Sequence, residues 1–319
     1  MRKGSLEFRP HRVAQRQMPR IRHWPQSAEA IPLGLVAIKA GMTHIALVDN
    51  SNAPSKGSEI VRGVTVLEVP RMYVYGVRLY KRSQYKEPAE EYYFKGFAKR
   101  FGIKNTKKAV ESIDSIKADD AEDVTALIFA DLAALGHGNK KSMRFEVPIG
   151  GKSTGEKLAY ITKVFGKEIK AAEIIKEGEY VDITGITKGK GWQGPIKRFG
   201  IARQVHKATK KIRHVGTLGA WHPPKVLYSV PQAGHLGYNY RTELNKRVYK
   251  VGNADSANQV NVAGGFLNYG IIRNDFIIVD GSVPGPAKRL VRIRKAIRNR
   301  AEPEPAEITY ISTTSKQGA

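Results

Sequence analysis

Residues 258–297 decide the fold most clearly, and they read NQVNVAGGFLNYGIIRNDFIIVDGSVPGPAKRLVRIRKAI. Short apolar runs alternate here with glycines and an Asn-Asp turn, a pattern typical of short β-strands. The preceding residues 246–253, KRVYKVGN, have the same character. Many short strands at irregular spacing favour a closed β-barrel over a parallel sheet.

Further strand patterns lie on the N-terminal side of this stretch. Residues 34–50, GLVAIKAGMTHIALVDN, predict two strands around a turn at Lys39-Ala40-Gly41. Residues 61–70 and 71–80 are rich in β-branched and aromatic residues, and EYVDITGIT (179–187) predicts another strand. We therefore expect residues 34–86 and 176–300 to build the barrel.

The segment between these two parts has a mixed α/β pattern. Apolar residues recur at helical spacing in 89–102, 121–136 and 157–178, and Gly136 and Gly178 stand where the helices should end. RFEVPIGG (144–151) predicts a strand. The fold class is therefore mainly β with an α/β insertion at 87–175. Residues 1–33 are expected to form a basic N-terminal extension, and 301–319 an extended C-terminal tail.

Composition narrows the class of partner. The 319 residues carry a net charge of +25, with a pI near 10.0, and their hydrophobic fraction of 41% suffices for a packed core. Such a charge persists only where a polyanion or a membrane surface neutralises it. The absence of cysteine excludes disulfides, thiolate zinc sites and cysteine nucleophiles. No eighteen apolar residues run together, so we expect a soluble protein.

The positive charge is concentrated in two places. Residues 1–26 hold seven Lys/Arg against Glu7 alone, whereas residues 87–182 are almost neutral, with 17 acidic and 16 basic side chains. Between Asp182 and Glu243 there are eleven Lys/Arg, four His and no carboxylate. An ordinary solvated surface mixes both signs. The N-terminus and this acid-free segment (residues 183–242) are therefore expected to contact phosphates.

The acid-free segment has the chemistry of an RNA-binding loop. It is rich in glycine and has no sustained apolar period, so cations can follow the RNA backbone and glycine N–H groups can approach phosphates. Aromatic and imidazole rings can stack on bases. The predicted RNA-binding residues are Arg2, Lys3, Arg9, Arg12, Arg16, Arg20, Arg22, Lys188, Lys190, Trp192, Lys197, Arg198, Arg203, Lys207, Lys210, Lys211, Arg213, Trp221, His222, Lys225 and Arg241.

Other functions find less support. KGKGWQG (188–194) lacks the Walker A spacing, and the histidines lack paired metal spacing. Asp182 and Glu243 could meet at the base of the loop, but capping a strand or pairing with lysine is the favoured role. VRIRKAIRNR (291–300) fits a strand edge lying on RNA better than a membrane helix. The alternative function, an RNA-modifying enzyme with a basic substrate groove, needs a cofactor motif or catalytic pair.

Four motifs carry a resemblance to a known family: GLVAIKAGMTH (34–44), DITGITKGKGWQGPIKRFG (182–200), GAWHPPKVLYSVPQAGHLGYNYRTELNKRVYKVG (219–252) and GGFLNYGIIRNDFIIVDGSVPGPAKRLVRIR (264–294). The chain resembles the universal large-subunit ribosomal protein number three, in its archaeal/eukaryotic form. The resemblance implies a six-stranded translation-protein-type β-barrel with an inserted α/β subdomain. It also implies that the N-terminal extension and a long central loop, here called the basic loop (residues 188–242), penetrate large-subunit rRNA.

The resemblance further implies a non-enzymatic cytoplasmic protein of the ribosome that helps nucleate subunit assembly. The loop tip, at Trp221, is expected near the peptidyl transferase centre. Expected neighbours are large-subunit protein fourteen and a protein of the twenty-four-e type, and no cofactor is expected beyond Mg or other cations that accompany rRNA. Eukaryotic relatives have a histidine, sometimes methylated, where Thr209 stands, so we predict no histidine modification there.

Overall fold

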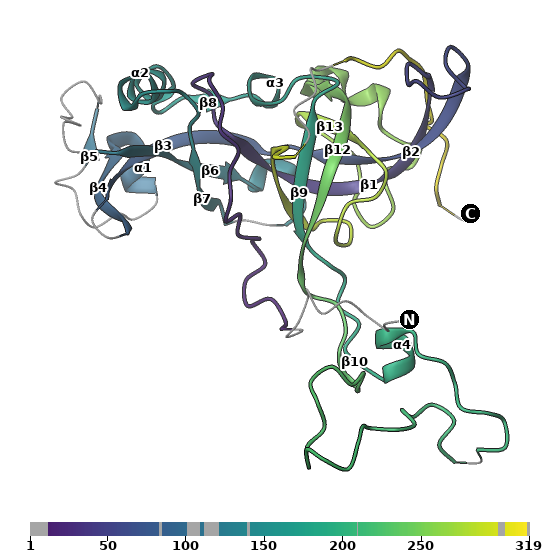
Figure 1. Ribbon diagram of the computed structural model, residues 1–319. Helices are drawn as coiled ribbons and strands as arrows, with labels where there is room; N and C mark the ends of the chain where they lie inside the picture. The colour runs from purple at the N-terminus through teal and green to yellow at the C-terminus, as the bar shows by residue number, and fades with distance from the viewer. Residues whose placement is uncertain are drawn as a thin grey trace. The chain divides into compact units, whose positions relative to one another are not determined.

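The computed structural model describes residues 12–82, 85–100, 109–111, 121–138, 141–208, 210–298 and 304–317 (Figure 1). The chain divides into two compact units. The first unit comprises residues 1–17 and 186–241, and the second comprises residues 18–185 and 242–319. Strands dominate the second unit, so the prediction of a mainly β fold is confirmed.

The first of the two large sheets contains seven strands, in the order β14-β9-β12-β13-β2-β1-β15. β14 also pairs with β1, so the path of pairings runs through six strands and returns to β14. Figure 1 shows β9, β12 and β13 side by side. The strands are β1 (Gly34–Val48), β2 (Glu59–Glu68), β9 (Tyr180–Ile186), β12 (Tyr240–Gly252), β13 (Phe276–Asp280), β14 (Leu290–Lys295) and β15 (Ile308–Ile311). A 3-10 helix, η3 (Ala254–Gln259), follows β12.

The expected turn at Lys39-Ala40-Gly41 is wrong, because β1 continues through it as one strand. The pairing of β1 with β2 shifts between Lys39 and Gly41, so Ala40 is an extra residue on β1. Such a bulge bends a strand without ending it. β1 thereby pairs with β14 through residues 34–38 and with β15 through residues 45–47. Within the predicted C-terminal tail, β15 joins the sheet by pairing with β1.

The second sheet holds most of the inserted segment. Its strand order is β5-β4-β3-β6-β7, and β8 pairs with β3. These strands are β3 (Arg71–Arg82), β4 (Lys86–Phe94), β5 (Ala109–Val110), β6 (Asp123–Asp131), β7 (Met143–Pro148) and β8 (Glu168–Ile169). The helices of this region are α1 (Lys95–Arg100), η2 (Ala133–Leu135), α2 (Thr154–Val164) and α3 (Ala171–Ile174).

The helices predicted for 121–136 and 89–102 are largely wrong. Residues 123–131 form β6 at an interior position of the sheet, and only η2 follows before Gly136, which has the left-handed conformation of a helix end. One face of β6 joins the main core through Val124 and Ile128, while Leu127 and Phe129 join an aromatic cluster on the other face. A strand buried on both faces has no alternation, so its apolar run also matches helical spacing. Residues 89–94 likewise belong to β4, and among the described residues of 89–102 only those of α1 are helical.

The single helix predicted for 157–178 is divided into α2 and α3, with β8 between them. α2 begins after Ser153, whose hydroxyl accepts a hydrogen bond from the Glu156 amide at 3.3 Å. Ile161 is the fully buried residue of α2, which packs on β3 and β6. The helix ends because the next residues join the sheet: Phe165 bridges to Val74, and the Gly166 amide donates to the Val74 carbonyl at 2.9 Å.

The expectation that residues 291–300 lie on RNA as a strand edge is wrong for β14. β14 pairs with β1 on one side and β9 on the other, so it is an interior strand. Arg292 is 7% exposed, lies between the rings of Trp24 and Phe145, and donates to the Glu146 carbonyl at 2.7 Å. Burial lowers the pKa of Arg292 to about 10.

Arg294 is also buried, and its partner is Asp182 of β9. The guanidinium donates to Asp182 Oδ2 from Nε at 3.2 Å and from Nη2 at 3.0 Å, and it also donates to the carbonyl of His23. Asp182 has no exposed surface and accepts a further bond from the Asn245 amide at 3.0 Å. The expected lysine partner is therefore an arginine. A buried carboxylate with a full set of donors is structural.

Candidate nucleic-acid interface

The acid-free segment begins and ends in an antiparallel stem. The Thr187 amide donates to the Asn239 carbonyl at 3.1 Å, and the Lys190 amide donates to the Leu236 carbonyl at 2.9 Å. The ladder continues into β10 (Trp192–Gln193) and β11 (Gly234–His235), where Trp192 faces His235. Backbone pairing therefore holds the two arms of the basic loop together before the segment between Gly194 and Ala233.

The N-terminal segment packs against the part of the basic loop that leads into β12, here called the returning arm (residues 226–240). The Ala14 amide donates to the Tyr238 carbonyl at 2.8 Å, and the Asn239 side chain donates to the Arg12 carbonyl at 2.8 Å. The Tyr240 hydroxyl donates to the Arg16 carbonyl at 3.1 Å. Arg12 and Arg16 thus share one structural unit with most of the acid-free segment, whereas Arg20 and Arg22 belong to the other unit. Sequence reasoning missed Asn239 and Tyr240 as the residues that join the N-terminal segment to the loop, because a polar residue in a loop carries no pattern that names its partner.

Gly237 allows the arms of the stem to approach each other. Its φ is +76°, and a Cβ at this position would lie 2.0 Å from the Lys188 carbonyl oxygen. We predict that Gly237→Ala destabilises the stem by about 1–3 kcal/mol, because the substitution adds backbone strain as well as a clash. Hydrogen exchange at the Lys190 and Leu236 amides should accelerate roughly 5- to 150-fold. Gly194→Ala is the control, since a Cβ there meets no atom within 4 Å. Equal exchange in both variants would contradict the prediction.

Most of the predicted rRNA-binding residues within the described ranges have exposed side chains. Arg2, Lys3 and Arg9 lie outside the described residues, as does Thr209. The exposed ones are Arg12, Arg16, Arg20, Arg22, Lys188, Lys190, Trp192, Lys197, Arg203, Lys207, Lys210, Lys211, Arg213, Trp221, His222 and Lys225. Exposure leaves these side chains available to a ligand, and their contacts with rRNA stay a prediction.

Two of the predicted residues are only partly exposed. Arg198 donates to two backbone carbonyls of the returning arm, from Nε to His235 at 3.1 Å and from Nη1 to Gln232 at 3.0 Å. Arg241 donates to the Tyr240 carbonyl at 2.8 Å, and burial lowers its pKa. Both arginines thus also organise the protein around them.

Large aromatic side chains of the loop are turned to solvent. Trp221 is 88% exposed, Tyr228 is 73% exposed and Trp192 is 68% exposed. The Trp192 ring meets His235 edge to face, with 5.3 Å between ring centroids. Exposed planar rings among cations provide stacking surfaces for unpaired bases. Exposure of such large apolar surfaces to water costs free energy unless a ligand covers them.

α4 (Pro195–Phe199) is the one α-helix that the structure describes within the acid-free segment. It begins with a proline at the first helical position and ends at Gly200, which has a φ of +68°. A proline and a glycine in these places are ordinary helix boundary signals. The sequence therefore contained the signal for this helix, although the segment has no sustained apolar period.

The described part of the chain contains no group of three or more His, Cys, Asp or Glu residues arranged to hold a metal ion. None of its helices has the length and apolar character that a membrane span requires. Asp182 forms an ion pair with Arg294, as described above, whereas the side chain of Glu243 is exposed.

Comparison with known proteins identifies the family. The family described as Ribosomal protein L3 matches residues 1–87 and 81–318. A protein named Large ribosomal subunit protein uL3 from Methanothermobacter thermautotrophicus is 42% identical, with 99% of this chain and 98% of the relative covered. Proteins of the same name from Methanobrevibacter smithii and Methanocaldococcus jannaschii are each 41% identical, again over 99% of this chain and over 98% and 97% of their own lengths. The resemblance seen in the sequence motifs is thus confirmed, and the chain belongs to the ribosomal protein L3 family.

Proposed function

We propose that the protein is a structural constituent of the large ribosomal subunit, with the ribosome of the cytoplasm as its place of action. It binds large-subunit rRNA and is not an enzyme. Membership of the L3 family supports this function. The observation that carries the mode of binding is the acid-free segment, in which cations and aromatic rings are exposed without a single carboxylate.

The interface consists of the basic loop and the N-terminal segment acting together. Arg12 and Arg16 lie on a segment that is bonded to the stem of the loop, so these two arginines and the loop cations present their charge from one unit. Charge-assisted contacts with phosphates supply most of the affinity, and the shape of the folded RNA supplies most of the specificity. Ions that accompany rRNA are the only cofactors expected.

Finer features of the family are part of the same proposal. The loop tip at Trp221 lies toward the peptidyl transferase centre, and the protein helps nucleate subunit assembly. Its neighbours are large-subunit protein fourteen and a twenty-four-e-type protein. The 88% exposure of Trp221 supports a role in contact with a partner.

The domain division expected from the sequence is 1–33, 34–86 with 176–300, 87–175 and 301–319, and we propose it with one change, at the start of the inserted subdomain. Six strands of the first sheet (β14, β9, β12, β13, β2 and β1) then form the barrel of the translation-protein type, which their returning path of pairings supports. β3 pairs with β4, β6 and β8 of the second sheet. This pairing favours a boundary before Arg71 for the inserted subdomain.

Sedimentation tests the function. We expect stoichiometric migration of the protein with large subunits. This migration persists through a high-salt wash because base stacking and shape complementarity with the folded RNA, which salt does not screen, add to the salt-sensitive phosphate contacts. Release of the protein into the free fraction at moderate salt, with the subunits otherwise intact, would contradict a structural role.

A further inference from the structure

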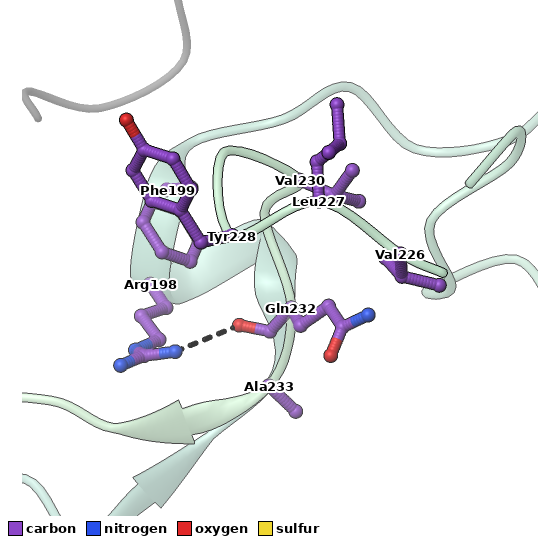
Figure 2. Close-up of a pocket in the computed structure, with 8 residues that line it drawn as sticks. All are labelled: Arg198, Phe199, Val226, Leu227, Tyr228, Val230, Gln232 and Ala233. Atoms are coloured by element: carbon purple, nitrogen blue, oxygen red, sulfur yellow. Dashed lines mark hydrogen bonds between the residues drawn. The ribbon is translucent and has the colours of Figure 1, made fainter. Parts of the chain in front are cut away.

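A small pocket lies within the basic loop, between α4 and the returning arm (Figure 2). Its volume is about 290 Å³. Arg198 and Phe199 of α4 form one side. The other side is formed by Val226, Leu227, Tyr228, Val230, Gln232 and Ala233. This volume is at the lower limit for ligand sites, roughly 300 Å³. It accommodates one planar ring system.

Contacts within the protein hold this pocket open in the absence of a ligand. The two hydrogen bonds from Arg198 to the Gln232 and His235 carbonyls join α4 to the returning arm. Figure 2 draws the bond to Gln232 as a dashed line, while the Gln232 side chain extends away from it. Gly234 leaves the space for this arginine, because a Cβ there would lie 2.5 Å from Nη1. The pocket therefore exists before binding, which reduces the entropic cost of filling it.

The lining combines the groups that recognise a nucleobase. Tyr228 offers an aromatic ring that is 73% exposed, and the guanidinium of Arg198 lies over the Phe199 ring at 5.0 Å. Val226 and Leu227 are about half exposed and add aliphatic contacts. The Gln232 side chain is exposed and provides a donor and an acceptor for the edge of a base. Stacking, aliphatic contact and one amide are the means by which proteins hold unstacked bases.

The charge around the pocket restricts the occupant. Residues 183–242 contain eleven Lys/Arg and no carboxylate, so a ligand that brings phosphates meets attraction and no repulsion. An apolar peptide segment would use the aliphatic wall but would leave this field unanswered. A base attached to its sugar and phosphate satisfies both the pocket and the surrounding cations.

We propose that this pocket binds a single unstacked base of large-subunit rRNA, with Tyr228 as the stacking surface and Gln232 as the group that contacts the base edge. The proposal rests on the proposed function and deepens it by assigning one nucleotide-binding subsite. Arg198 then acts as a positioning residue, which shapes the pocket by tying α4 to the returning arm.

Base-specific chemical probing of reconstituted large subunits tests this subsite. With the wild-type chain, we expect the pocket to protect one unpaired base within the larger footprint of the loop. With Tyr228→Ala its reactivity should rise roughly 5- to 150-fold, the factor that corresponds to one base stacked on an aromatic ring. Tyr228→Phe keeps the ring and should keep the protection. Tyr310→Ala makes the same chemical change at a tyrosine that is 51% exposed on β15, and it should leave that base protected.

The possible outcomes separate this subsite from the proposed function. If the wild-type chain protects rRNA and Tyr228→Ala changes no base, the pocket holds something else and the subsite is refuted. If Tyr228→Ala alters the entire loop footprint, and Tyr228→Phe does so too, the tyrosine hydroxyl has a structural role and the stacking proposal fails. If the wild-type chain protects no rRNA at all, the proposed function itself fails.

Discussion

Alanine replacement of six exposed loop lysines is expected to weaken binding to large-subunit rRNA by about 10³-fold near 0.2 M salt. The lysines are Lys188, Lys190, Lys197, Lys207, Lys211 and Lys225, and each has an exposed side chain. Where a phosphate contact is lost, the counterions at that phosphate are no longer released on binding. The slope of log K against log salt should therefore become shallower by about four to five. Filter binding or fluorescence titration over a range of salt concentrations measures both quantities.

A variant with the same change in net charge provides the control. The exposed lysines Lys56, Lys141, Lys152, Lys163, Lys167 and Lys170 all lie outside the acid-free segment. If binding depends on the local interface, their replacement by alanine should change the slope much less. Equal loss in the two variants would mean that overall charge drives binding, and the loop would lose its special role.

The second large effect is expected on folding, at the buried pair of Asp182 and Arg294. We expect Asp182→Ala to lower the free energy of unfolding by about 3–5 kcal/mol, because it leaves the Arg294 cation buried without its carboxylate. Asp182 also accepts the Asn245 and Ile297 amides, at 3.0 and 3.4 Å, so these donors lose their partner as well. Urea unfolding of the RNA-free chain measures the change. Trp24 is a suitable reporter because it packs against the main core and faces Arg292.

Glu111→Ala is the matched control for this substitution. Glu111 pairs with Lys95 at 2.8 Å, but its side chain is 77% exposed and that of Lys95 is 64% exposed. Solvent screens such a pair, so the urea midpoint should not move. A midpoint for Asp182→Ala that equals the control value would show that the buried pair contributes nothing to stability.

The fold could be predicted from sequence where runs of β-branched residues are short and have clear boundaries. β2, β9 and β13 follow their patterns of β-branched residues. The prediction failed where tertiary burial removes the pattern, as in β6, whose two faces enter two different apolar clusters. It also failed at β14, since the alternation of Val291 and Ile293 with Arg292 and Arg294 suggests a strand with one solvent-exposed face. Both arginines are instead buried by partners from distant parts of the chain.

The candidate interface could be located from sequence but its internal construction could not. The absence of carboxylates between Asp182 and Glu243 identifies the segment without any structure. The bonds from Ala14 and Asn239 that join the N-terminal segment to the stem depend on residues more than 200 positions apart. Likewise, Arg198 reads as a phosphate ligand in the sequence, whereas in the fold it ties α4 to the returning arm. Local composition determines charge, but long-range contacts determine which charges remain free.

The central claim is that the basic loop contacts large-subunit rRNA, and a footprint of a loop-shortened chain tests it most directly. Gln193 and Gly234 face each other in the stem, so an Asn-Gly turn can replace residues 194–233 and close the stem as a tight hairpin. Chemical probing would compare large subunits that carry either the full or the shortened chain. We predict that the shortened chain loses a discrete set of rRNA protections and retains the others. Identical footprints for the two chains would contradict the account.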